Sequence, residues 1–118
     1  MEVAMIPELD LGRVRRWVDA RNDGLPEHSR GLIRYELDVT DRTVTIVECR
    51  PPWRPEYGSE WTRFPIARFR YTKMRGEWSL YWRDRNLKFH EYDLAAPTPH
   101  IEELLAEIER DPTSILRG

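Results

Sequence analysis

The chain has 118 residues, of which 34% are charged, with a formal net charge of −2 and a single cysteine, Cys49. This length suits one domain with one hydrophobic core, and a lone cysteine excludes an internal disulfide. No apolar run is long enough for a membrane span or a signal peptide, so we expect a single soluble domain over residues 1–118, located in the cytoplasm and without a membrane partner.

The first element expected is a helix over residues 11–21. Leu11, Val14 and Val18 recur at helical spacing, and Asp10 directly before them is a favoured N-cap residue. The residues that follow include asparagine, aspartate, glycine and proline, which typically end a helix. The helix therefore has one apolar face that can pack against the rest of the domain.

Two strands joined by a tight turn follow this helix. Apolar and charged residues alternate strictly from Ile33 to Val39, the pattern of a strand with one buried face. Residues 40–42 then connect to a second strand over 43–50, which is rich in β-branched residues and ends before Pro51. We expect these two segments to form an antiparallel hairpin.

Three further strands are expected over residues 62–72, 77–83 and 87–92. Pro65 lacks a backbone N–H, which favours a sheet edge or a bulge near the start of the first of them. The alternation along the last two strands predicts that one of their faces enters the core. That face consists of Trp78, Leu80, Trp82, Leu87 and Phe89.

A second helix closes the chain. Thr98 is expected as its N-cap and Pro99 as its first residue, and an apolar stripe at helical spacing runs from Ile101 to Ile108 and stops before Pro112. The predicted fold is α+β, a five-stranded antiparallel sheet in meander order flanked by an N-terminal and a C-terminal helix.

The segment 61–92 carries a strong positive charge. It contains eight basic and three acidic side chains, a net charge of +5 in a chain whose total is −2. Because side chains alternate across a strand, the face opposite the predicted core carries basic and aromatic side chains together. The candidate ligand-binding residues on that face are Arg68, Arg70, Tyr81, Arg83, Lys88, His90 and Tyr92.

A basic face with aromatic rings suits an anionic ligand. Cations neutralise phosphates while rings stack on bases, the combination that holds single-stranded nucleic acid. We therefore predict a small binding module whose partner is single-stranded nucleic acid or, as the second choice, an acidic protein surface. The same pattern also fits a solvated sheet face stabilised by cross-strand pairs, and the sequence has no ribonucleoprotein, helix-turn-helix or zinc-finger motif.

An enzyme is the competing and less favoured hypothesis. Its candidate catalytic residues are Glu48, Lys73 and His90, which would have to converge within hydrogen-bonding reach of one substrate. An acid followed two residues later by a base on a strand is a feature of metal-dependent nucleases and hydrolases, and Asp38 or Asp41 would then supply the first acid.

Metals and self-association complete the predictions. The three histidines lie far apart and outside metal-ligand spacing, so we predict no metal site and no cofactor. Cys49 has no base near it in sequence and is expected in the core. An exposed face of tyrosine and arginine also suits a protein-interaction surface or a homodimer, which is the third hypothesis.

Four short motifs are spread over the chain: Glu-Cys-Arg-Pro-Pro-Trp at 48–53, Tyr-Thr-Lys at 71–73, Trp-Ser-Leu-Tyr-Trp-Arg at 78–83 and Leu-Lys-Phe-His-Glu-Tyr at 87–92. Together they resemble a small bacterial family known only as domain of unknown function 3024, with Phe89 where a tryptophan is usual. The resemblance covers nearly the whole chain and implies no established activity or cofactor. It singles out, as residues for a site, Glu48, Arg50, Lys73, Tyr81, Arg83 and His90.

Overall fold

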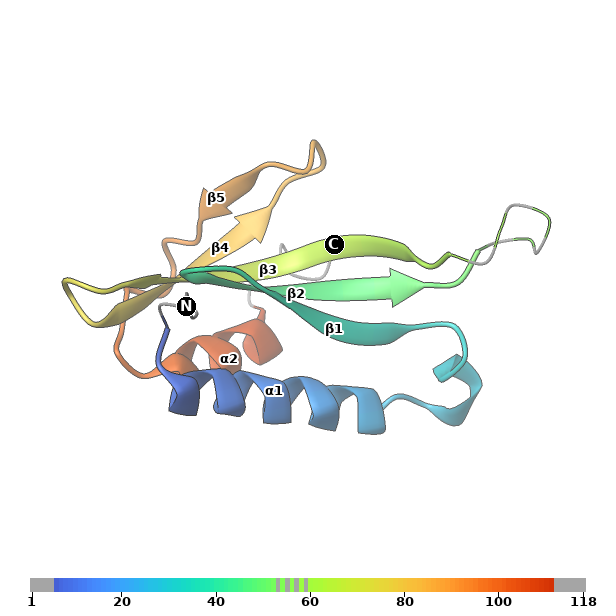
Figure 1. Ribbon diagram of the computed structural model, residues 1–118, viewed down its shortest axis with the longest axis horizontal. Coiled ribbons are helices and arrows are strands. Elements are labelled where there is room, and N and C mark those ends of the chain that lie inside the picture. The colour runs from blue at the N-terminus through green and yellow to red at the C-terminus, as the bar shows by residue number, and fades with distance from the viewer. Residues whose placement is uncertain (1–5, 53, 55, 57, 59, 112–118) are drawn as a thin grey trace.

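One antiparallel sheet and two helices make up the fold (Figure 1). A computed structural model describes residues 6–52, 54, 56, 58 and 60–111. The elements of this part, in chain order, are α1 (Glu8–Asp23), η1 (Glu27–Ser29), β1 (Arg34–Val39), β2 (Thr43–Arg50), β3 (Thr62–Thr72), β4 (Glu77–Arg83), β5 (Phe89–Glu91) and α2 (Ile101–Arg110). The five strands pair antiparallel in the order β1-β2-β3-β4-β5, which confirms the predicted meander and the α+β class.

The helix α1 begins earlier than the sequence predicts. The carbonyl oxygen of Pro7 accepts a hydrogen bond from the Leu11 amide at 3.1 Å, so the first turn already includes Asp10. The expectation that Asp10 is the N-cap is therefore wrong. Asp10 is buried, and its carboxylate accepts hydrogen bonds from Arg13 and from the indole of Trp78. This carboxylate satisfies a donor in the core instead of the end of the helix.

The last turn of α1 is tied to the outer strand β1 by a side-chain amide. The Nδ2 atom of Asn22 donates a hydrogen bond to the carbonyl oxygen of Tyr35 at 2.9 Å, and the Tyr35 amide donates to Asn22 Oδ1 at 2.7 Å. Asn22 thus pairs with an edge strand as a neighbouring backbone would, which protects that edge.

The strands β2 and β3 have the bounds that the sequence predicts. Ile46 pairs with Ala67, but the next residue, Val47, pairs with Pro65, so Ile66 is the extra residue of a β-bulge. The expected irregularity near Pro65 is confirmed. Pairing between β3 and β4 starts only at Ala67, so the first part of β3 pairs with β2 alone.

The β4–β5 hairpin has a longer loop than predicted. Arg83 pairs with Phe89, and the Asp84 amide donates to the Lys88 carbonyl oxygen at 2.8 Å across the loop. Leu87 lies in this loop with a left-handed backbone, φ 67°, and is 60% exposed.

The pairing across this loop shows which residues of β5 face the core side. Directly opposite residues of an antiparallel pair lie on the same face, so Phe89 shares a face with Arg83, and His90 shares one with Trp82. The expectation that Leu87 and Phe89 join Trp82 in the core is therefore wrong. The predicted loop, 84–86, and the observed loop, 84–88, both have an odd number of residues, so either one places Phe89 on the face of Tyr81 and Arg83.

The helix α2 begins at Ile101, later than predicted. The backbone of Thr98 forms an isolated bridge with Trp78, with N–H···O bonds of 2.7 and 3.0 Å, so Thr98 belongs to the sheet edge. His100 occupies the N-cap position, and its amide donates to Thr98 Oγ1 at 3.1 Å. Thr98 and Pro99 therefore do not start the helix, because the bridge to β4 holds Thr98 in extended pairing.

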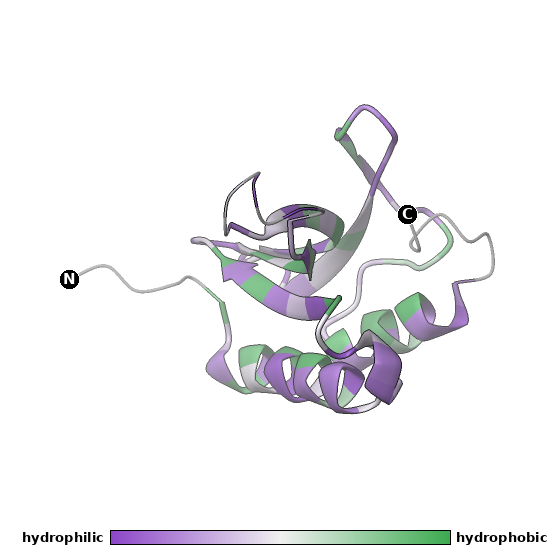
Figure 2. Cartoon of the chain, turned by 90° about the vertical axis from the view of Figure 1, so that its right-hand side faces the viewer, coloured by the Kyte–Doolittle hydropathy of each residue, from purple (hydrophilic) through white to green (hydrophobic). Residues whose placement is uncertain are grey.

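Both helices cover the same face of the sheet (Figures 1 and 2). No described helix covers the opposite face, which we call the open face. None of the helices in the described part is long and apolar enough to span a membrane. The fully buried core between the helices and the sheet includes Val14, Val44, Ile46, Ala67, Phe69, Trp78, Leu80, Ile101 and Leu104.

Candidate functional site

The strand register brings four of the predicted ligand-binding residues onto the open face. Arg68 pairs across β3 and β4 with Tyr81, and Arg70 lies two residues further along β3, so these three side chains share a face. Arg83 follows Tyr81 by two residues on β4 and is on the same face. Phe69 and Leu80 alternate with these residues along β3 and β4, and both are buried in the core. The arginines and Tyr81 therefore lie on the open face.

Arg68 is the central and best fixed of these side chains. Its Nε donates a 2.9 Å hydrogen bond to Thr45 Oγ1 of β2, and its guanidinium lies 4.0 Å from the ring centroid of Phe89. Such a cation–π contact orients the guanidinium plane against the ring. Arg68 is half-buried by these contacts, while both terminal nitrogens are without a carboxylate partner in the described part of the chain.

Arg70 and Arg83 continue the same pattern. Arg70 is exposed, and Arg83 donates from Nε to the Pro65 carbonyl oxygen and from Nη1 to the Asp84 carbonyl oxygen at 3.2 Å. Neither forms an ion pair with any residue that the structure describes. Two glutamates of β4 and β5, Glu77 and Glu91, lie on this face without pairing to these arginines. We call Arg68, Arg70, Tyr81, Arg83 and Phe89 the basic-aromatic patch.

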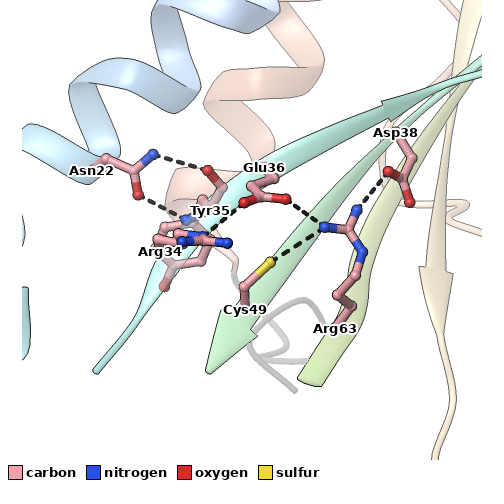
Figure 3. A network of polar contacts seen from close by, with 7 residues as sticks. All are labelled: Asn22, Arg34, Tyr35, Glu36, Asp38, Cys49 and Arg63. Carbon is pink, nitrogen blue, oxygen red and sulfur yellow. Dashed lines mark hydrogen bonds and ion pairs between the residues drawn. The ribbon is translucent and has the colours of Figure 1, made fainter. Parts of the chain in front are cut away.

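The other end of the open face is balanced in charge (Figure 3). Arg63 of β3 forms ion pairs with Glu36 and, at 2.6 Å, with Asp38, both on β1. Arg34 adds a 2.7 Å ion pair to Glu36. The hydrogen bond to Arg63 lowers the pKa of the Glu36 carboxyl below its ordinary value and raises the pKa of Arg63. These four side chains neutralise one another, so little attraction remains for an external ion.

Cys49 lies beneath this network. Its side chain is fully buried although its register position is on the open face, because Arg63 crosses above it with Nη1 at 3.8 Å from Sγ (Figure 3). Burial raises the pKa of the thiol above its ordinary value. A protonated, covered thiol is a poor nucleophile. The prediction of a buried Cys49 is confirmed, but the cover is a layer of charged side chains and not the main core.

Two of the predicted ligand-binding residues are absent from this face because His90 pairs with Trp82, and Tyr92 lies opposite Leu80. Tyr92 is 2% exposed, and its hydroxyl donates a 2.6 Å hydrogen bond to Glu107 Oε2 of α2. His90 lies on the other face. The centroids of the His90 and Trp82 rings are 4.9 Å apart, and His90 Nε2 is 2.6 Å from Asp84 Oδ2. The expectations that Tyr92 and His90 lie beside Tyr81 are wrong.

Lys88 is exposed in the β4–β5 loop and directly precedes Phe89. Its amide donates to Asp84 Oδ1 at 3.0 Å, so the backbone at Lys88 is part of the loop and not of the sheet ladder. The expectation that Lys88 lies on a strand face with Arg83 is therefore also wrong.

The three candidate catalytic residues do not come together. Glu48 is paired with Phe64 across the sheet and forms a 2.8 Å ion pair with Arg50. Lys73 lies in the β3–β4 turn, nine residues from Phe64 along β3, or about 30 Å at the rise of an extended strand. His90 is three strands from Glu48, about 14 Å at the usual strand spacing. The three side chains therefore cannot act together on the same reacting atoms.

Metal-ligating side chains are also dispersed. Among the residues that the structure describes, no group of three or more histidine, cysteine, aspartate or glutamate side chains could hold a metal ion. Asp38, the proposed first acid of a nuclease site, is held by Arg63. The described residues therefore do not form the carboxylate cluster that the metal-dependent hydrolase hypothesis requires.

Phe89 is the member of the patch that sequence reasoning missed, because it was assigned to the core. The available signal was the pairing of the hairpin, because a loop with an odd number of residues after Arg83 puts Phe89 on the face of Arg83. Asp84 Oδ1 accepts hydrogen bonds from the amides of Asn86 and Lys88, at 2.8 and 3.0 Å, as an aspartate at the start of a turn often does. With this loop Phe89 lies opposite Arg83, and the shorter loop 84–86 would have placed Phe89 opposite Tyr81, on the same face.

A comparison with known protein families shows which family the chain matches. The family described as domain of unknown function (DUF3024) matches residues 3–118. No curated protein matches the chain, and no solved structure does. The match covers nearly the whole chain, so the chain belongs to this family, and the resemblance noted in the sequence is confirmed.

Proposed function

We propose that this member of the DUF3024 family is a small binding module for an anionic ligand, and that the ligand is single-stranded nucleic acid held on the basic-aromatic patch. In this proposal Arg68, Arg70 and Arg83 neutralise phosphates, and Tyr81 and Phe89 provide surfaces for bases. Lys88 lies in the loop at the rim of the patch, and His90 lies on the other face of the sheet. Neither is part of the proposed site.

The contrast between the two ends of the open face carries the proposal. Arg34 and Arg63, at one end, are matched by carboxylates at hydrogen-bonding distance. Arg68, Arg70 and Arg83, at the other end, have hydroxyl, carbonyl or no partners among the described residues, and none has a carboxylate. Uncompensated guanidinium groups on one surface raise the local concentration of anions.

The aromatic side chains favour nucleic acid over a simple anion. Tyr81 lies directly across from Arg68, and Phe89 contacts the Arg68 guanidinium. Bases stack on aromatic rings and on arginine planes with little sequence preference, at about 1–3 kcal/mol per base. A ligand with only charge would use the arginines and gain nothing from the rings.

The test is fluorescence anisotropy of a labelled single-stranded oligonucleotide, titrated with protein at about 50 and 200 mM salt. The informative variants are Arg70→Ala, which removes an exposed group with no described contact, and Arg68→Ala/Arg70→Ala. The control is Arg15→Ala, which removes the same charge from an exposed position on α1, on the helix side of the sheet.

We expect saturable binding that weakens with salt, and a salt slope that falls by about 1.4 when two phosphate contacts to a single strand are lost. The control should bind like the wild type. Absence of binding at low salt would overturn the proposal. Equal binding of poly-glutamate and of the oligonucleotide would instead identify an acidic protein surface as the ligand.

A further inference from the structure

A carboxylate lies on the open face directly beside the ring of Tyr81. Glu91 of β5 pairs with Tyr81 of β4, and directly opposite residues of an antiparallel pair lie on the same face. The Cβ atoms of such a pair are about 5 Å apart. Glu91 is exposed, and Tyr81 is half-buried. The basic-aromatic patch therefore has a ring and a carboxylate at adjacent positions.

The carboxylate of Glu91 has no partner among the residues that the structure describes. Arg83, its diagonal neighbour on β4, directs its guanidinium to two backbone carbonyl oxygens. Arg68 directs its guanidinium to the ring of Phe89. A carboxylate can only accept hydrogen bonds, so both oxygens of Glu91 are available to donors of a ligand.

A nucleotide bound at Tyr81 meets this carboxylate with its base. Its phosphate is attracted by the arginines of the patch and repelled by Glu91, so the phosphate lies away from the carboxylate. The Watson–Crick edge of an unpaired base is open to contacts with protein side chains. The donors and acceptors along that edge therefore decide which base fits beside Glu91.

Guanine is the base whose edge matches a carboxylate. Its N1–H and its N2 amino group are adjacent donors, and a carboxylate can accept two parallel hydrogen bonds. Adenine and cytosine each present one amino group beside an acceptor nitrogen. Uracil presents one N–H between two carbonyl oxygens. These three bases therefore place an acceptor against the carboxylate, which is unfavourable.

We propose that the basic-aromatic patch selects guanine at the nucleotide that stacks on Tyr81, and that Glu91 is the residue that determines this preference. The inference rests on the proposed function, because it names the base that the same site prefers. Glu91 accepts hydrogen bonds from N1–H and from the N2 amino group, while Tyr81 supports the plane of the base.

A carboxylate that only repelled the ligand would act differently. It would lower the affinity for every oligonucleotide alike, through repulsion of the phosphates. A carboxylate that contacts guanine raises the affinity for guanine relative to the other bases. Specificity is a difference between two affinities, so the ratio of dissociation constants for two oligonucleotides separates these roles.

Fluorescence anisotropy at about 50 mM salt tests the inference. The probes are labelled uridine oligonucleotides of about ten nucleotides that differ at one central position, which is guanine, inosine or adenine. Inosine keeps N1–H and lacks the N2 amino group. The wild type should bind the guanine probe about tenfold more tightly than the adenine probe, with the inosine probe between them. The deoxyribose probes should give the same order, because the contact is to the base.

Glu91→Gln keeps the size of the side chain and removes its charge. It should bind the guanine and adenine probes nearly equally, with the affinity for the adenine probe unchanged or raised. Because Glu91 is exposed and has no described partner, this variant should fold like the wild type. The matched control is Glu77→Gln, which removes a charge from the same face of β4 about 13 Å from Tyr81 and should keep the wild-type preference.

Wild-type binding without a preference for guanine would overturn this inference and leave the proposed function in place. A preference that persists in Glu91→Gln would also overturn it. So would a preference for ribose over deoxyribose with none among the bases, since the carboxylate would then contact the sugar. Absence of binding to every probe is a different result, because it would refute the proposed function itself.

Discussion

The indole Nε1 of Trp78 lies 2.9 Å from the carboxylate Oδ2 of Asp10, although 68 residues separate them. This buried hydrogen bond joins the middle of the sheet to the first turn of α1. A carboxylate in a core needs donors, and Asp10 obtains a second one from Arg13 at 2.6 Å. The pair therefore holds the N-terminal helix at a fixed position on the sheet.

Replacing Asp10 by alanine should lower the free energy of unfolding by about 1–3 kcal/mol, because it leaves the Trp78 N–H buried without an acceptor. Urea unfolding measures this change. Asp19→Ala, at an exposed position of the same helix, should stay within about 0.5 kcal/mol of the wild type. Equal effects of the two substitutions would contradict a structural role for the Asp10–Trp78 bond.

The buried contact between Tyr92 and Glu107 should make stability depend on alkaline pH. Burial, and then the hydrogen bond to the Glu107 carboxylate, raises the pKa of Tyr92 to about 12. An unfolded tyrosine titrates near pH ~10. The native state therefore holds this proton more tightly, so its contribution is complete below about pH 10 and is lost as the pH rises toward about 12.

Urea unfolding of the wild type and of Tyr92→Phe at a series of alkaline pH values isolates this effect from other titrations. Over that window the wild type should lose about 2 kcal/mol more than the variant, which has no proton to release. Parallel curves for the two proteins would show that the Tyr92 hydroxyl titrates normally in the native state.

Cys49 should react slowly with a thiol reagent in the native protein, because its thiol is covered by Arg63 and burial raises its pKa. Arg63→Ala removes the cover and should increase the reaction rate by about tenfold or more. Arg70→Ala, on the same strand but away from Cys49, serves as the control and should react at the wild-type rate. A fast wild-type reaction would mean that the network opens readily.

The position of β5 yields a test at the ligand site. Phe89→Leu should weaken oligonucleotide binding, because it removes the ring that contacts Arg68, by a factor corresponding to about 1 kcal/mol or more. His90→Ala should leave binding unchanged, since its ring lies against Trp82 on the other face. Anisotropy titrations of the two variants decide whether the ligand contacts the basic-aromatic patch, which includes Phe89, or the residues predicted from the sequence, which include His90. The reverse pattern would restore His90 to the site.

The strands β2, β3 and β4 could be predicted to the residue because local signals agree there. β-Branched residues indicate β2, alternation indicates β4, and prolines or turn residues follow the ends of all three strands. The bulge at Ile66 was likewise predictable, since Pro65 cannot take part in a regular ladder. These elements place Arg68, Arg70, Tyr81 and Arg83 on one face.

The remaining differences arise where a distant contact outweighs a local preference. Asp10 is a good N-cap by type, but Trp78 offers it a buried donor. Thr98 is a good N-cap too, but its backbone pairs with β4. Tyr92 continues an alternating strand in sequence, yet its ring is buried and its hydroxyl bonds to α2. None of these partners is near in the chain.

The sequence by itself determined the α+β meander, the order of its elements and the basic character of the segment 61–92, because hydrophobic period, turn residues and charge are local properties. Only the tertiary structure decided which cations are neutralised and which are not. That depends on register across strands: Arg63 meets Glu36 and Asp38, whereas Arg68 meets Thr45 and Phe89. The pairing of β4 with β5 similarly places Phe89 opposite Arg83 on the open face and His90 opposite Trp82 on the other face.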